Sequence, residues 1–150
     1  MTTNVRTVLT VMMALLVAAV FGDLVAAPVH ETKGDVVLLH GGIGMDDRAA
    51  MEAKASEHNL KLTFARKGSG AYLSDVKVVV KNKQGVVLVD TVASGPWLLA
   101  KLPAGDYTVS ATERDDTLTQ NIAIKGNARR DWVFRFELPK GVAQEFDAGK

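Results

Sequence analysis

Between residues 60 and 138 the chain repeats short runs in which apolar and polar side chains alternate, and turn residues separate the runs. In the last run, Trp132, Phe134 and Phe136 alternate with polar or smaller neighbours. A period of two is typical of a β-strand that buries one face. About seven such runs, spaced by roughly ten residues, predict a mainly β fold, an antiparallel β-sandwich.

The apolar positions of these runs predict the core between the two sheets. They are Leu60, Leu62, Phe64, Val76, Val78, Val80, Leu98, Leu102, Tyr107, Val109, Trp132, Phe134 and Phe136. Hydrophobic residues make up 47% of the chain, which is enough for a sizeable core, and cysteine is absent. Disulfides, thiolate metal sites and cysteine nucleophiles are therefore excluded, and we expect packing alone to hold the fold together.

The segments on either side of residues 60–138 lack this alternation. Residues 28–35 are polar and aperiodic, so we expect a flexible lead-in. Residues 36–40 are a short apolar run and predict one short strand. Residues 139–150 are mostly polar, and we expect a disordered tail. We therefore place the domain at residues 60–138, with residues 28–59 packed on it.

Residues 45–58 are rich in alanine, glutamate, methionine and lysine, which are good helix formers. They predict a helix whose apolar face, with Ala50, Met51 and Ala55, is made of small residues and packs closely on the sheet. Asn59 follows, and we expect it to end the helix in the left-handed conformation.

Residues 1–27 have the layout of a secretory signal peptide. Arg6 precedes an uncharged run over residues 7–22, and small residues follow at 25–27. The run is shorter than the ~20 residues that span a bilayer comfortably. We expect export to a periplasm or to the medium; the alternative is an uncleaved N-terminal anchor, and the cleavage site stays open.

Residues 102–109, Leu-Pro-Ala-Gly-Asp-Tyr-Thr-Val, connect two of the predicted strands. They resemble the LPxGxYTV signature of carboxypeptidase regulatory-like domains, and the resemblance extends over residues 72–138. The chain also resembles a group of small exported bacterial proteins in which a GGIG segment, here residues 41–44, and a helix precede a segment like residues 59–65. These resemblances imply an Ig-like or transthyretin-like (prealbumin-like) sandwich, preceded by one short strand and one α-helix, with no assigned activity.

Within that signature, Pro103, Gly105 and Tyr107 predict a structural corner. Pro103 restricts φ, and Gly105 allows a tight reversal. Tyr107 can then bury its ring while its hydroxyl bonds to the backbone across the corner, as in other sandwiches. We expect this structural role rather than ligand binding.

Two glycine-containing patterns suggest chemistry but are incomplete. Residues 37–42 resemble the strand and oxyanion loop of α/β-hydrolases, yet neither residues 68–70 nor residues 93–95 complete the G-x-S-x-G elbow that this fold requires. Residues 41–44 precede a helix, as phosphate loops do, but they lack G-K-[ST], and the aspartates that follow would repel an anion. A tight strand-to-helix turn is the alternative that we favour.

The titratable residues do not assemble a site in the sequence. Histidine occurs three times, without the spacing of metal ligands, at His30, His40 and His58. The sequence therefore predicts no catalytic residue, no metal site and no cofactor. A cleft that gathers His40, Asp46, Asp47 and Arg66 would instead favour an enzyme.

Pro96 and Trp97 are the predicted contacts for a partner. A tryptophan beside Pro and Gly is a typical recognition residue when it is exposed. The alternation places Trp97 on the face opposite Leu98 and Leu102. The alternative, which we favour, is that Trp97 packs under the helix at residues 45–58.

The formal net charge of +1 offers no electrostatic argument for a nucleic-acid partner. The sequence favours a non-enzymatic exported β-sandwich that acts as a binding or structural module of the cell envelope, with another envelope protein as its expected partner. The alternative is an accessory or regulatory subunit of a periplasmic enzyme, acting in trans. The ligand, the oligomeric state and the physiological role stay open.

Overall fold

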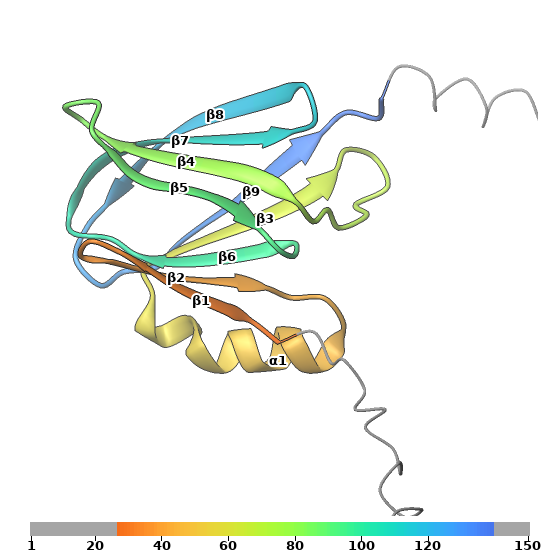
Figure 1. Ribbon diagram of the computed structural model, residues 1–150, viewed down its shortest axis with the longest axis horizontal. Coiled ribbons are helices and arrows are strands. Elements are labelled where there is room, and N and C mark those ends of the chain that lie inside the picture. Colours follow the sequence, from red (N-terminus) through yellow and green to blue (C-terminus); the bar gives the residue numbers. More distant parts are fainter. Residues whose placement is uncertain (1–26, 140–150) are drawn as a thin grey trace, which may run out of the picture.

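Two β-sheets stack face to face, and one α-helix lies on the outer side of the first sheet (Figure 1). The computed structural model describes residues 27–139. The predicted signal peptide, up to residue 26, and residues 140–150 of the predicted tail lie outside the described residues. Within residues 27–139 the chain is mainly β, and its two sheets form a sandwich.

The first sheet has five strands and the second has four. In spatial order, the first contains β1 (Val29–Lys33), β2 (Val36–Gly41), β6 (Trp97–Lys101), β3 (Leu60–Arg66) and β9 (Arg130–Phe136). The second contains β5 (Val87–Ala93), β4 (Val76–Asn82), β7 (Gly105–Glu113) and β8 (Asp116–Ile124). The helix α1 (Met45–Lys54) and a short 3-10 turn, η1 (Ala55–Glu57), connect β2 to β3.

The predicted core lies between the two sheets, with one exception. The apolar side of each alternating strand faces inward, and twelve of the thirteen predicted core residues are buried. Trp132 is the exception, because 41% of its surface is exposed. The alternation indicates the face on which a side chain lies but not how well it is covered: Phe134 and Phe136, farther along the same edge strand, are buried, whereas Trp132 near its start is not.

Seven strands follow residue 60, as the turn spacing predicts, and almost all neighbouring strands run antiparallel. The pair β3 and β9 runs parallel, with Leu60 beside Arg130 and Arg66 beside Phe136. The two strands are joined through the whole second sheet, which is the long connection that parallel neighbours require.

The predicted flexible lead-in is wrong for most of its length. Residues 29–33 form β1, which pairs with β2 from Val29 opposite His40 to Lys33 opposite Val36. Gly34, with a φ of 60°, lies in the tight turn between them. The prediction missed β1 because an edge strand with one covered face can carry polar residues at most positions.

The helix packs on the sheet through a second, smaller core. Met51 and Ala55 contact Leu39 of β2 and Leu99 of β6, and all four are buried. Ala50, which was predicted to lie on the same face, is exposed. No helix within residues 27–139 has the length and apolarity needed to cross a bilayer.

The predicted left-handed conformation of Asn59 at the end of the helix is wrong, because Asn59 does not have a positive φ. It is buried, and its amide nitrogen donates to the carbonyl oxygens of Leu102 and Gly126 at 2.8 and 3.0 Å. Its amide oxygen accepts the N–H of Leu102 at 2.9 Å. A buried side chain that satisfies backbone groups in this way joins the end of β6 to the turn before β9.

Candidate functional site

The predicted corner brings Pro103 and Tyr107 together. The Tyr107 hydroxyl donates to the Pro103 carbonyl oxygen at 2.7 Å, and the ring is 5% exposed. Burial raises the pKa of Tyr107 above its ordinary value. Gly105 opens β7 beside this ring, where an added methyl would lie 3.7 Å from it. These contacts are those of a corner that connects two sheets.

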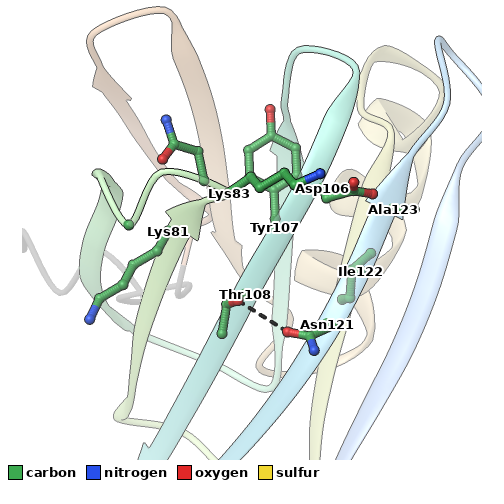
Figure 2. Close-up of a pocket in the computed structure, with 10 residues that line it drawn as sticks. Lys81, Lys83, Asp106, Tyr107, Thr108, Asn121, Ile122 and Ala123 are labelled. Carbon is green, nitrogen blue, oxygen red and sulfur yellow. Dashed lines mark hydrogen bonds between the residues drawn. The ribbon is translucent and has the colours of Figure 1, made fainter.

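A hollow of about 570 Å³ lies next to the corner, on the four-stranded sheet. Figure 2 shows Lys81 extending away from Asp106, while Thr108 and Asn121 are joined by a hydrogen bond of 3.0 Å. Lys81, Asp106 and Asn121 are exposed to solvent. The buried polar side chain in the lining is Tyr107, and its hydroxyl is already bonded to Pro103, so the geometry of this hollow supports no particular chemistry.

Of the four side chains whose convergence would favour an enzyme, three have separate partners. Asp46 is exposed. Arg66 forms a bidentate ion pair with Glu113, at 2.9 and 3.1 Å, and also donates to the carbonyl oxygen of Glu137. Asp47 binds backbone N–H groups of the turn before α1, and His40 accepts the N–H of Ser94 between β2 and β5.

Asp47 holds the glycine-rich turn between β2 and α1. One carboxylate oxygen accepts the N–H groups of Gly42 and Ile43, at 2.6 and 2.9 Å. Arg48 donates to the carbonyl oxygen of Gly42 at 3.2 Å. Residues 41–44 are therefore a tight strand-to-helix turn, and the N–H groups that a phosphate would need are bound by the protein's own carboxylate.

His40 is buried at the seam between β2 and β5, where it joins Ser94 to Glu31. The Ser94 N–H donates to His40 Nδ1 at 3.1 Å, and Ser94 Oγ lies 3.0 Å from the same nitrogen. His40 Nε2 lies 3.4 Å from a carboxylate oxygen of Glu31, and the other oxygen accepts from Thr91 at 2.8 Å. The sequence analysis missed this group because its members come from three strands.

A serine, a histidine and a carboxylate in a row resemble a catalytic triad, but the hydrogen bonds favour a structural role. A general base must keep a lone pair free for the hydroxyl proton. In His40 the Nδ1 lone pair already accepts the backbone N–H of Ser94. Gly95 also lies so close to Gly41 that an added methyl would be 2.2 Å from the Gly41 carbonyl oxygen. His40 thus stabilises the turn that precedes β6 through its contacts with Ser94.

Trp97, at the start of β6, is partly buried and packs against the small core under α1. The Lys61 ammonium group lies 3.7 Å from the centroid of its indole, a cation–π contact, and also pairs with Glu52 of α1 at 2.9 Å. Pro96 is buried, and its carbonyl oxygen accepts the Phe64 N–H. Of the two predicted contacts, only Trp97 therefore reaches the surface.

Next to Trp97 lies a hollow of about 420 Å³, which we call the β3–β9 groove. Its lining residues come from β3, β9, the start of β6 and the loop after β3; they are Lys61, Thr63, Ala65, Gly70, Tyr72, Trp97, Asp131, Trp132, Val133 and Arg135. The groove lies beside the part of the first sheet that α1 covers. Tyr72 is 53% exposed, and the Arg48 guanidinium lies 5.7 Å from the centroid of its ring.

Two of the three charges in the β3–β9 groove are neutralised nearby. Lys61 pairs with Glu52, and Asp131 pairs with Arg129 at 2.8 Å. Arg135 has neither an ion pair nor a hydrogen bond within residues 27–139. The alternation of β3 and β9 could have placed Thr63 and Arg135 on one outer face. Only the strand pairing sets Thr63 beside Trp97 of β6 and sets β9, with Arg135, beside β3.

No protein-family model matches this chain, and no curated protein sequence shows a significant match to it.

Proposed function

We propose that this chain is a non-enzymatic binding module, exported to the cell envelope, and that the β3–β9 groove is its binding site. One observation carries the proposal. The groove combines two aromatic side chains that reach the surface, Tyr72 and Trp97, with an arginine that has no partner within the described residues. Aromatic side chains and arginine are the residue types that dominate recognition surfaces.

The size of the groove supports a ligand site. Its volume of about 420 Å³ lies within the range of roughly 300–1,000 Å³ that small-molecule sites occupy. The ion pair between Lys61 and Glu52 and the contact of Lys61 with Trp97 hold one wall in place. A wall that is ordered before the ligand arrives lowers the entropic cost of binding.

We also propose that the sandwich is transthyretin-like and related to carboxypeptidase regulatory-like domains. The two stacked sheets and the bond from Tyr107 to Pro103 support this relationship. In such an arrangement the corner is structural, and the opposite, outer face of the first sheet is available for binding.

Sedimentation with the envelope fraction of the producing cells tests the proposed function. The wild-type protein is expected to sediment with that fraction, and the double variant Tyr72→Ala, Arg135→Gln is expected to stay in the supernatant. Both residues are exposed, so the fold should tolerate the changes, and circular dichroism checks that it does.

A matched double variant, Lys81→Gln and Asn121→Ala, alters the hollow near the corner in Figure 2 instead. It is expected to sediment like the wild type. If the groove variant sediments as fully as the wild type, or if the corner variant alone is released, the assignment of the binding site to the groove is wrong. Recovery of an enzyme with the protein would favour the accessory-subunit alternative.

A further inference from the structure

The polar groups in the β3–β9 groove that lack partners are mainly hydrogen-bond donors. Within residues 27–139, no hydrogen bond satisfies the indole N–H group of Trp97, the Arg135 guanidinium, or the hydroxyls of Thr63 and Tyr72. Indole and guanidinium nitrogens can only donate, whereas hydroxyls can do both. A complementary ligand must therefore be rich in acceptor oxygens.

The charge of the groove also favours a ligand with acceptor oxygens, and one that is negatively charged. Since Lys61 and Asp131 are each paired with a residue outside the lining, Arg135 is the charge left for a ligand. A guanidinium group matches a carboxylate with two parallel hydrogen bonds. A carboxylate on the ligand would therefore match Arg135.

The lining of the groove does not match an extended peptide strand. The groove lies on the side-chain face of β3 and β9, because Lys61, Thr63, Asp131, Val133 and Arg135 are the alternate residues that point away from the core. A peptide strand that adds to the sheet would pair with the free backbone edge of β9 and would not lie on this side-chain face. A sugar ring has no such requirement, because its hydroxyls lie around its rim.

The aromatic side chains of the groove also suit a saccharide ring. Tyr72 is 53% exposed, so it can offer a ring surface to the apolar face of a sugar beside Trp97, which also reaches the surface. The side chains of Thr63 and Ala65 on β3 and of Val133 on β9, which also line the groove, are small. A flat ring can therefore approach the sheet closely.

We propose that the β3–β9 groove binds an acidic saccharide, with a sugar ring stacked on the exposed aromatic side chains and its carboxylate held by Arg135. This inference rests on the proposed binding function, and it names the class of ligand. The Thr63 and Tyr72 hydroxyls and the Trp97 indole N–H bind the ring and hydroxyl oxygens.

Titration of the purified protein with oligogalacturonate, a uronic-acid saccharide, and with neutral maltohexaose tests the inference, with tryptophan fluorescence and calorimetry as readouts. The acidic saccharide is expected to bind at least about tenfold more tightly than the neutral one. Arg135→Gln is expected to remove this preference, and Tyr72→Ala is expected to weaken the binding of both saccharides.

Arg130→Gln is the matched control, because Arg130 is an exposed arginine on the same strand but outside the lining of the groove. It is expected to leave both affinities unchanged. Equal binding of the two saccharides, or equal losses from Arg135→Gln and Arg130→Gln, would overturn the inference. If neither saccharide binds while sedimentation with the envelope still depends on the groove, the ligand class is wrong and the proposed function stands.

Discussion

The outer face of the first sheet has a covered half and an open half, and the two are built from different sequence patterns. In the covered half, Leu39 of β2 and Leu99 of β6 lie under Met51 of α1. In the open half, Thr63 of β3 and Arg135 of β9 face the β3–β9 groove. Figure 1 shows α1 below β1 and β2, away from β9.

The difference follows from how many faces of each strand are buried. In the covered half, consecutive residues are apolar, as in Leu38-Leu39 and Leu98-Leu99, because one member of each pair faces the main core and the other faces the helix. β3 and β9 alternate because their outer face reaches solvent. The change from apolar runs to alternation thus marks where the helix stops covering the sheet.

The largest expected effect compares the two halves directly. Leu99→Ala leaves a cavity beneath α1 and should lower the free energy of unfolding by about 3 kcal/mol. Val133→Ala, in the partly exposed open half, should lower it by about 1 kcal/mol or less. Urea unfolding followed by tryptophan fluorescence measures both. Similar losses would mean that α1 contributes little to stability and that the division of the sheet has no energetic basis.

A second, smaller effect is expected at the turn that leads from β5 into β6 of the covered half. A methyl group on Gly95 would lie 2.2 Å from the carbonyl oxygen of Gly41 and 2.5 Å from its carbon, so Gly95→Ala should cost about 2–3 kcal/mol. Gly68→Ala is the comparison. Gly68 has open space around it but a φ of 84°, so the cost there is the conformational one, about 1 kcal/mol. Thermal unfolding of both variants measures the difference, and an equal or smaller loss for Gly95→Ala would contradict the close approach.

The smallest effect concerns Glu52, which links the helix to the open half. The hydrogen bond and charge of Lys61, aided by the charge of Arg129, hold the pKa of Glu52 below its ordinary 4.5. A carboxyl whose pKa is lowered by folding stabilises the protein above pH 4.5, and this contribution disappears as the pH falls through the lowered value. Because Glu52 is half exposed, the contribution should be only about 0.5 kcal/mol.

Unfolding measured from pH 6 to pH 3 tests this link. The stability of the wild type should fall more than that of Glu52→Gln below pH 4.5, since the variant has no carboxyl to protonate. Parallel curves would show that the pair with Lys61 adds nothing to the attachment of α1.

The alternating strands could be predicted from the sequence, while their ends and edges could not. Phe134 and Phe136 are buried as predicted, but Trp132, on the same face near the start of β9, is 41% exposed. The strand at residues 29–33 was missed because its pairing with β2, rather than its own composition, makes it a strand.

The candidate site was predictable only in part. The sequence singled out Trp97, and its packing against the core under α1 agrees with the alternative that we favoured. It did not connect Trp97 with Tyr72 or Arg135, and it did not bring His40 to Ser94, which is 54 positions away. Such pairs depend on which strands become neighbours, and local patterns carry no information about that.

By itself, therefore, the sequence determined where the strands of residues 60–138 lie and which of their faces are apolar, because a period of two is a local property of extended backbone. The tertiary structure alone decided the strand order, the parallel pairing of β3 with β9 and the groove that this pairing creates. Strand order is set by the burial of the whole core and by hydrogen bonds between distant segments, so it emerges only when all the strands are assembled.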